Sequence, residues 1–247
     1  MQLRYRSAVR SHPGLVRNVN EDMALGRDDV ALWMVADGMG GHAHGDWASQ
    51  TLASHVAAVD LAVPLPDRGP AILAALHAGN AAIVEAAARA GSQMGTTAVL
   101  LHLEGHDVLC VWVGDSRAYR FRRGELQQLT RDHSVAQELI DRGVIDAAEA
   151  ETHPMAHVLS RAVGTESQLQ TESVHEQAQP GDQYLICSDG LTKVVPDADI
   201  AMMLRLPNID AVADRLVAET LARGAPDNVT VILVSVEEVT ELLRVEA

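Results

Sequence analysis

Four aspartates stand where apolar stretches of the sequence stop or start. Asp37, Asp115 and Asp189 each end such a stretch, and Asp227 stands just before one that begins at Val229. A carboxylate at the edge of a core is costly to desolvate unless something pairs with it. Asp-Gly is also a common turn pair, so a single occurrence would not separate a turn from a site. The recurrence at predicted strand ends favours a site, and acids that converge there would repel each other without a cation.

The residue types in this pattern select a hard metal ion. Carboxylate and carbonyl oxygens, without histidine or cysteine, suit Mg²⁺ or Mn²⁺. The glycine after Asp37 lets the backbone approach closely and offers the Gly38 carbonyl oxygen as a ligand. Glu21 and Asp22 form a second acidic cluster, five residues after Arg17. A guanidinium near a metal can hold a phosphoryl group through its fork of donors, although an arginine alone is more typical of an ordinary surface.

The elements that must position these residues come as paired helices and runs of strands. Apolar–polar alternation and β-branched stretches predict strands, at residues 3–9, 23–26, 30–36, 96–103, 107–113, 117–122, 126–129, 171–177, 183–187 and 229–236. Helical spacing and alanine density predict helices, at residues 46–59, 70–90, 134–142, 146–151, 197–206 and 209–223.

This order favours an α+β fold over a doubly wound parallel sheet. We expect two stacked antiparallel β-sheets flanked by pairs of α-helices, a four-layer αββα sandwich. The three strands between residues 96 and 122 are joined by short turns and are expected to form one antiparallel meander. The Val/Ile-rich stretch at 229–236 is expected to be a central strand.

Composition excludes several functions. A formal net charge of −15 over 247 residues argues against binding to nucleic acid or anionic membranes. An acidic protein that acts on phosphate must therefore neutralise its site locally, which cations can do. No apolar run reaches the roughly 20 residues of a membrane span, and no signal-peptide pattern opens the chain. We expect a cytoplasmic single domain, residues 1–247, with no membrane span and with Cys110 and Cys187 as buried, reduced thiols.

Eight short motifs occur in one order along the chain. They are 17–22 (Arg-Asn-Val-Asn-Glu-Asp), 35–42 (Val-Ala-Asp-Gly-Met-Gly-Gly-His), 94–97 (Met-Gly-Thr-Thr), 114–117 (Gly-Asp-Ser-Arg), 129–134 (Leu-Thr-Arg-Asp-His-Ser), 159–164 (Leu-Ser-Arg-Ala-Val-Gly), 188–191 (Ser-Asp-Gly-Leu) and 227–230 (Asp-Asn-Val-Thr). Each is unspecific alone. Together they resemble the bacterial branch of the PPM (type 2C) metal-dependent Ser/Thr protein phosphatases.

The resemblance implies a dinuclear Mn²⁺ or Mg²⁺ centre with a possible third ion. By motif, Asp37 would bridge both ions and the Gly38 carbonyl would bind one of them. Asp189 and Asp227 would bind the other ion. Asp22 would contact the centre through water.

The resemblance also implies roles around this centre. Asp115, together with Asp189, resembles the ligands of a third, weaker metal site, and Arg17 would bind the substrate phosphate. The segment 133–165 matches a mobile flap subdomain that helps to admit and select substrate. The residues expected to support the centre are Glu21, His42 and Asn228.

The expected reaction is hydrolysis of phosphoserine and phosphothreonine on proteins. Two metals roughly 4 Å apart would share a water and lower its pKa, and the resulting hydroxide would attack phosphorus in line. Arg17 and the ions would balance the phosphoryl charge, and no phospho-enzyme is expected. The implied partners are phosphorylated proteins, namely a bacterial Ser/Thr kinase and its substrates, and the implied enzyme is a monomer.

Two stretches depart from the family pattern. Gly-Gly-His is followed by Ala43-His44-Gly45-Asp46, where relatives often have small residues and Glu. His42 or His44 could donate a proton to the leaving group, but a structural role is favoured for both. In the flap, Ala156-His157 stands where relatives often carry Arg-Asn. That change concerns substrate preference and leaves the metal ligands untouched.

Other functions fit the sequence less well. Gly38-Met-Gly40-Gly-His-Ala43 matches a dinucleotide-binding motif, but Asp37 would face the pyrophosphate. A thiol phosphatase needs five residues between cysteine and arginine, whereas six separate Cys110 from Arg117. A non-catalytic scaffold would be marked by lost carboxylates, and they are present. A phosphatase that acts on an anti-sigma-type partner remains an alternative within the same class of hydrolases.

Overall fold

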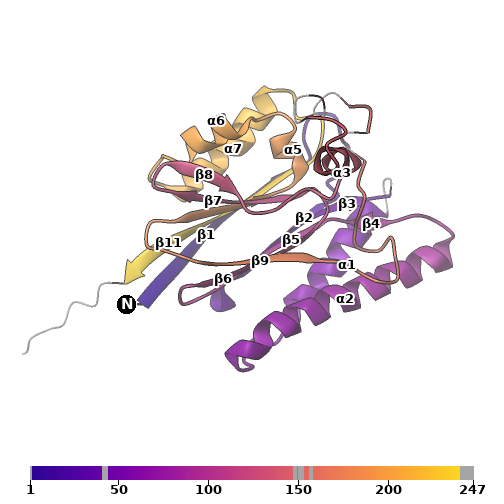
Figure 1. Ribbon diagram of the computed structural model, residues 1–247, viewed down its shortest axis with the longest axis horizontal. Coiled ribbons are helices and arrows are strands. Elements are labelled where there is room, and N and C mark those ends of the chain that lie inside the picture. The colour runs from indigo at the N-terminus through magenta and orange to yellow at the C-terminus, as the bar shows by residue number, and fades with distance from the viewer. Residues whose placement is uncertain (1, 41–43, 147–148, 150–152, 156–157, 240–247) are drawn as a thin grey trace, which may run out of the picture.

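Two antiparallel β-sheets stack face to face at the centre of the fold (Figure 1). The computed structural model describes residues 2–40, 44–146, 149, 153–155 and 158–239. The first sheet has the strand order β1 (Gln2–His12), β11 (Val229–Val239), β10 (Gln183–Cys187), β7 (Arg117–Arg122) and β8 (Glu125–Gln128). The second has the order β2 (Asp22–Arg27), β3 (Leu32–Met39), β5 (Ala98–Glu104), β6 (Asp107–Val113) and β9 (Glu172–Gln177), with β4 (Gly95–Thr96) paired to β3.

Helices cover the outer face of each sheet, which confirms the expected αββα order. The long helices α1 (Gly45–Ala57) and α2 (Leu65–Ala90) lie on the second sheet. The first sheet is covered by α5 (Asp189–Thr192), α6 (Asp197–Met203) and α7 (Ile209–Ala222). Two short elements complete the described part of the chain, the 3-10 helix η1 (Asp28–Val30) and α3 (Val135–Asp141).

The strands explain how the carboxylates come together. Alternate residues of a strand face opposite sides of a sheet. In β3, Trp33 and Val35 pack between the two sheets, whereas Met34 packs beneath α1 and α2. Asp37 has the parity of Trp33 and Val35, so it falls on the face between the sheets. In β2, Asp22 pairs with Asp37 in the antiparallel register and therefore shares that face.

The same parity applies in the first sheet. In β11, Ile232 and Val234 pack between the sheets, whereas Leu233 packs beneath α7. Thr230 therefore lies on the inner face, and so does Ser188, which follows Ile186 of β10 by two residues. Both hydroxyls are buried. The two sheets thus bring polar side chains together at one end of an otherwise apolar layer.

Several predicted elements need correction. The expected meander is wrong, because β6 pairs with β5 and β9, while β7 pairs with β10 and β8 in the other sheet. The chain passes from one sheet to the other at Gly114, where a positive φ of 105° turns the backbone sharply. Helix α2 begins at Leu65 rather than at 70, because Pro66 lies in its first turn, where a missing N–H costs little. The short helix α5 was not predicted, and most of the helix expected at 146–151 lies outside the described residues.

Helix α2 has the length and apolar composition of a membrane span, contrary to the expectation that no run would. One such helix is weak evidence, because a core helix passes the same test. Ile72, Leu76 and Ile83 on one side of α2 belong to the core that it shares with α1 and the second sheet. Its apolar character is therefore accounted for by this packing.

Candidate metal centre

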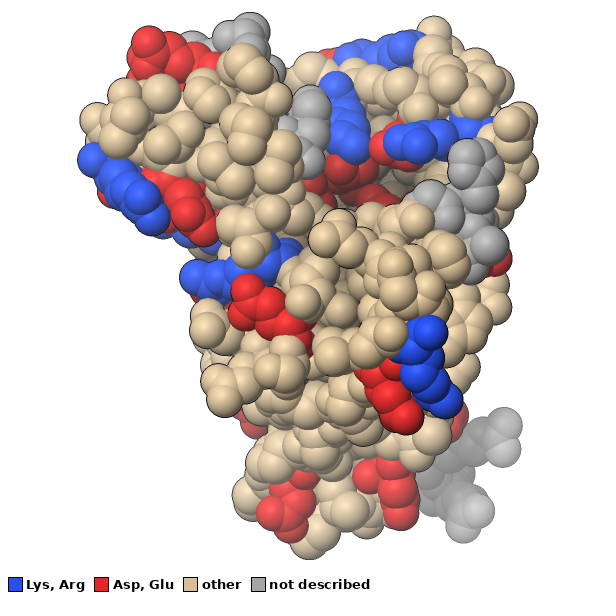
Figure 2. Space-filling model, turned by 90° about the vertical axis from the view of Figure 1, so that its right-hand side faces the viewer, with Lys and Arg blue, Asp and Glu red and all other residues tan. Residues whose placement is uncertain are grey.

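The predicted site residues meet in an acidic pocket of about 490 Å³ at one end of the sandwich. Figure 2 shows this face, on which carboxylates lie in a recess beside Lys and Arg side chains. Asp22 lies behind the pocket, 8% exposed and opposite Asp37 in the β2–β3 register. His42 lies outside the described residues. The predicted residues that line the pocket are Arg17, Glu21, Asp37, Gly38, Asp115, Asp189, Asp227 and Asn228.

The backbone of Asp37 is held by the Gly-Thr-Thr motif. Its carbonyl oxygen accepts hydrogen bonds from the Thr97 N–H at 2.8 Å and from the Thr96 hydroxyl at 3.0 Å. Its own N–H donates to Thr97 Oγ1 at 2.9 Å. Thr97 Oγ1 lies 2.7 Å from Ser116 Oγ, next to Asp115. Since both backbone groups of Asp37 are engaged, its carboxylate is presented to the pocket in a fixed direction.

The glycines after Asp37 and Asp189 are required by close backbone contacts. A Cβ on Gly38 would lie 2.1 Å from the carbonyl oxygen of Gly45 at the start of α1. A Cβ on Gly190 would lie 1.8 Å from the carbonyl oxygen of Asn228. Neither glycine has a positive φ. These Asp-Gly pairs are therefore packing contacts at the site and not the positive-φ turns that the pair often forms.

Asp22 is a buried carboxyl group with one satisfied oxygen. Its Oδ2 accepts a hydrogen bond from the Ser188 hydroxyl at 2.7 Å, and its Oδ1 has no hydrogen-bond partner. Burial raises the pKa of Asp22 to about 7, and the charges of Asp189 and Asp227 add to the rise, against hydrogen bonds from Ser188 and Thr230. The group is therefore poorly compensated as an anion.

Asp37 and Asp115 behave in the same way. Burial raises the pKa of Asp37 well above its usual range, and the charges of Asp22, Asp189 and Asp115 raise it further. Burial likewise raises the pKa of Asp115 to about 8, with added repulsion from Asp189 and Asp132. We call Asp22, Asp37 and Asp115 the inner side of the centre. Its three carboxyl groups favour the neutral form unless a cation joins them.

Asp189 and Asp227 form an ion-paired side. Lys193 Nζ lies 2.5 Å from Asp189 Oδ2 and 3.1 Å from Asp227 Oδ2. Arg17 Nε lies 3.0 Å from Asp227 Oδ1, and its Nη2 donates to Oδ2 at 3.2 Å. Burial raises the pKa of Asp227, but the ion pairs with Lys193 and Arg17 outweigh it and leave the pKa below its usual value.

The donor set fits divalent ions that prefer oxygen. Buried oxygens of Asp22 and Asp189 lack hydrogen-bond partners, and the pocket lining adds the carboxylates of Asp37, Asp115 and Asp227. Among the described residues, no three His, Cys, Asp or Glu side chains stand close enough to hold a metal as they are. The pairing of Asp189 and Asp227 with Lys193 and Arg17 accounts for this, since those cations already engage their oxygens.

Asn228 supports the centre by clamping the loop that carries Arg17. Its Oδ1 accepts a hydrogen bond from the Glu21 N–H at 2.8 Å. Its Nδ2 donates to the carbonyl oxygens of Pro13 and Val19 at 2.9 and 3.0 Å. The side chain thus satisfies three backbone groups between residues 13 and 21 at once.

His133 is a positioning residue whose role could not be recognised from the sequence. The ring Nδ1 of His133 accepts a hydrogen bond from the Gly114 backbone N–H at 3.1 Å. The backbone N–H of His133 donates to the Gly114 carbonyl oxygen at 2.9 Å. The ring stacks on Trp112, and its Nε2 lies 3.3 Å from Glu172 Oε1. Burial lowers the pKa of His133, against the pull of Glu172. A neutral His133 therefore fixes the turn that presents Asp115. His133 belongs to the motif at 129–134, but this motif lies too far along the chain from Gly114 to indicate the contact.

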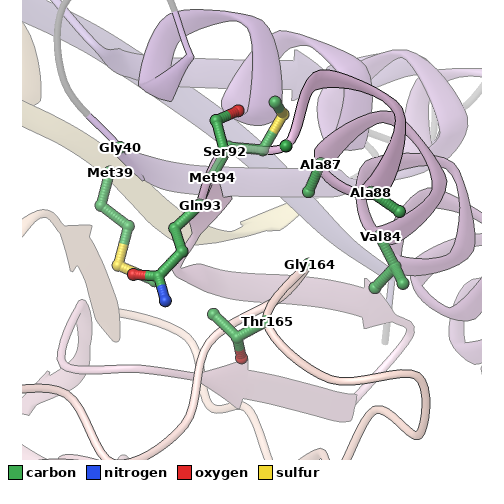
Figure 3. Close-up of a pocket in the computed structure, with 11 residues that line it drawn as sticks. Met39, Gly40, Val84, Ala87, Ala88, Ser92, Gln93, Met94, Gly164 and Thr165 are labelled. Carbon is green, nitrogen blue, oxygen red and sulfur yellow. The ribbon is translucent and has the colours of Figure 1, made fainter.

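A second, more apolar pocket of about 680 Å³ adjoins the first (Figure 3). Met39 and Gly40 line both pockets. The far wall comes from the C-terminal turns of α2, with Val84, Ala87 and Ala88. Asn80 on α2 accepts a hydrogen bond from the Gly164 N–H at 2.7 Å. This contact holds the segment at Gly164, which also lines the pocket, against the helix.

Comparison with known proteins settles the family. The model of the protein phosphatase 2C family matches residues 6–229. The chain belongs to the protein phosphatase 2C family. This match confirms the resemblance that the eight motifs indicate, and the structure confirms the two-sheet fold.

Three comparisons show how far the likeness extends. The serine/threonine protein phosphatase PstP of Mycobacterium tuberculosis is 40% identical over 236 residues, which cover 94% of this chain and 45% of PstP. This chain thus spans about half the length of that curated relative. The structure of PppA, a regulatory component of the type VI secretion system in Pseudomonas aeruginosa, matches with a TM-score of 0.88 and 42% identity over 94% of this chain and 98% of PppA. The catalytic domain of PstP, solved with two manganese ions, has a TM-score of 0.87 and 38% identity over 96% of this chain and all of that domain.

Proposed function

We propose that this chain is a Mn²⁺- or Mg²⁺-dependent phosphatase that hydrolyses phosphoserine and phosphothreonine on proteins. The observation that carries the proposal is the convergence of four aspartates on one pocket with Asp22 buried behind them, where oxygens of Asp22 and Asp189 lack hydrogen-bond partners. Support comes from the relatives, which are named Ser/Thr phosphatases, and from the PstP domain that holds two manganese ions.

The ligand roles follow the geometry of the two sides. Asp37 and the Gly38 carbonyl would hold ions on the inner side, where Asp115 offers a further carboxylate for a third ion. Asp189 and Asp227 would hold an ion on the ion-paired side. When bound, such ions supply an acidified water and neutralise the charge of a phosphoryl group.

The residues of the chain then bind and orient the substrate. Arg17 is 52% exposed and is anchored to Asp227 through Nε and one terminal nitrogen. A guanidinium has five N–H donors, so the anchored side chain retains donors for phosphoryl oxygens. Asn228 and Glu21 set the position of the loop that carries Arg17, through the Glu21 N–H. Asp22 would contact the centre from behind through water, with its carboxylate held by the Ser188 hydroxyl.

The proposal also covers where the enzyme acts and which proteins it acts on. We infer a cytoplasmic enzyme that opposes a bacterial Ser/Thr kinase, built as a single catalytic domain over residues 1–247 with a flap around 133–165. The likeness to PppA makes control of a secretion system a candidate setting. Within the described part of the flap, Ser134 pairs with Leu159, and Val163 joins the flap to Thr96 in the rest of the fold.

Hydrolysis of a phosphothreonine peptide by the purified chain tests this function. Activity should require Mn²⁺ or Mg²⁺ and disappear with a chelator, and Asp189→Asn and Asp227→Asn should each be inactive although folded. Full activity without metal would refute the mechanism, and retained activity in both variants would refute the site. Incubating an inactive variant with phosphorylated cell extract and identifying the captured protein would test the kinase partner.

A further inference from the structure

Lys193 is the only lysine in the chain, whereas the other 18 Lys and Arg positions are all arginine. It lies four residues after Asp189, directly after the short helix α5. Residues four apart on a helix are neighbours, so this spacing places the ammonium beside Asp189. The sequence assigned no role to Lys193, because a helix of four residues shows no periodicity.

The ammonium joins two carboxylates that come from different parts of the chain. Asp189 follows β10, and Asp227 precedes β11. Lys193 Nζ lies 2.5 Å from Oδ2 of the first and 3.1 Å from Oδ2 of the second. Its side chain is 22% exposed and lines the acidic pocket. A positive charge therefore stands inside the centre, on oxygens of two proposed metal ligands.

The positive charge of Lys193 also acts on carboxylates of the inner side. Lys193 is the cation that opposes the raised pKa of both Asp37 and Asp115. By contrast, Arg17 holds Asp227 from the pocket rim, where its side chain is 52% exposed. Among the described residues, Lys193 is thus the cation that acts on both sides of the centre.

We propose that Lys193 is a resident cation of the metal centre, which competes with a divalent ion for Asp189 and Asp227 and so sets the affinity for metal. This inference rests on the metal centre proposed above. Two cations that share the same carboxylate oxygens repel each other. The divalent ion therefore binds after the ammonium has withdrawn, or it binds more weakly while the ammonium stays. Lys193 is a positioning residue in this scheme, because it acts through the two aspartates.

The choice of lysine fits this role. An ammonium is a compact point charge on a flexible stem, so it can leave two carboxylates without breaking a rigid paired geometry. A guanidinium in the same place would form a bidentate fork with one carboxylate and would leave less readily. The rest of the chain uses arginine for its ion pairs, for example Arg117 with Asp132 and Arg122 with Asp182.

Mn²⁺ titration calorimetry of Lys193→Met tests the competition. We expect Lys193→Met to bind Mn²⁺ about tenfold more tightly than wild type, since one unit charge is removed beside the ion. Lys193→Arg should bind with wild-type or weaker affinity. Arg215→Met is a matched control, because Arg215 pairs only with Glu219 on α7 among the described residues and its loss removes the same charge far from the pocket. Unchanged or weaker binding by a folded Lys193→Met would overturn the proposal.

A second measurement needs no variant. Wild-type protein labelled with ¹³C-lysine has one lysine side chain and gives a single Cε–Hε cross-peak. Titration with diamagnetic Mg²⁺ should move this peak towards the position of a solvent-exposed lysine, with the dissociation constant that calorimetry gives for Mg²⁺. A peak that stays in place while Mg²⁺ binds would contradict withdrawal of the ammonium.

The two proposals fail differently. If neither Mn²⁺ nor Mg²⁺ binds wild type, the metal centre and the phosphatase function fail together. If metal binds wild type and Lys193→Met equally and the lysine peak does not respond, only the role of Lys193 fails.

Discussion

The inner side and the ion-paired side of the centre use the same residue type in opposite electrostatic settings. On the inner side, burial raises the pKa of Asp22 to about 7 and that of Asp115 to about 8. On the ion-paired side, the contacts with Lys193 and Arg17 outweigh burial and lower the pKa of Asp227. Carboxylates of both sides line one pocket, so the charges around each group, and not the shared location alone, determine its state.

This contrast shows where the protein depends on an external cation. The chain supplies its own positive charges to Asp189 and Asp227. For Asp22, the described contact is a hydrogen bond from the Ser188 hydroxyl, and for Asp37 the described hydrogen bonds engage its backbone at Thr96 and Thr97 and not its carboxylate. Divalent metal should therefore change the stability and ionisation of the inner side most, and variants on the two sides should respond differently to it.

The largest expected effect is the loss of activity in Asp37→Asn. The substitution removes the charge that faces the pocket while the backbone contacts to Thr96 and Thr97 can remain. We expect the rate of phosphopeptide hydrolysis to fall by about a thousandfold or more. Asp46→Asn on α1, outside the pocket lining, is the control and should keep its rate. Substantial activity in Asp37→Asn at saturating Mn²⁺ would remove Asp37 from the centre.

The pH dependence of stability should separate the two sides next. An aspartate whose folded-state pKa is raised stabilises the fold at low pH and loses that contribution as pH rises through its folded-state pKa. For Asp22 and Asp115 this loss should continue to about pH 8. Chelated protein should therefore melt several degrees lower at pH 8.5 than at pH 6.5 in calorimetry.

The buried histidines oppose this decline only near the lower end of the range. Burial lowers the pKa of His102 and His133, so their contribution to stability rises with pH and is nearly complete about one unit above their usual pKa of 6.5. Saturating Mn²⁺ should flatten the decline, since a divalent cation favours the ionised carboxylates. A melting temperature that rises between these pH values in chelated protein would show that the inner side is not strained by its charge.

A smaller effect is expected from Thr97→Val. Valine keeps the shape but removes the hydroxyl that accepts the Asp37 N–H and contacts Ser116. Loss of such a supporting contact typically lowers metal affinity or activity by about 10- to 100-fold. Thr220→Val, which removes a buried hydroxyl on α7, is the matched control and should lower stability without changing the rate. Equal rates in wild type and Thr97→Val would show that Asp37 needs no such support.

The smallest effect should come from His133→Phe. Phenylalanine can still stack on Trp112 but cannot accept the hydrogen bond from Gly114. The turn that presents Asp115 should loosen, and the Mn²⁺ concentration for half-maximal activity should rise by roughly threefold to tenfold. The rate at saturating Mn²⁺ should change less. A metal requirement that does not move would separate His133 from Asp115.

Much of the fold and the convergence of the acidic residues could be predicted from the sequence. Strand parity alone places Asp37 on the inner face of β3, because it follows Trp33 and Val35 by even steps. The carboxylate types then indicate a hard ion. The αββα order followed from paired helices and antiparallel strands, and the buried strand β11 was visible as a Val/Ile run.

The rest depended on contacts between residues that are distant in sequence. The crossing between β6 and β7 could not be seen, since the link at Gly114 is as short as a hairpin turn. The clamp by Asn228 joins positions about 210 residues apart, and that by His133 acts through a turn 19 residues away. The Lys193 contact to Asp227 depends equally on the pairing of β10 with β11.

Anomalous diffraction from crystals soaked in Mn²⁺ tests the metal centre most directly. We expect two peaks roughly 4 Å apart in the acidic pocket, with Asp37 between them, Asp189 and Asp227 on one ion, and the Lys193 ammonium withdrawn from both carboxylates. Peaks elsewhere on the molecule, or an ion in the pocket that Asp37 does not contact, would contradict the shared site that the two sheets are inferred to build.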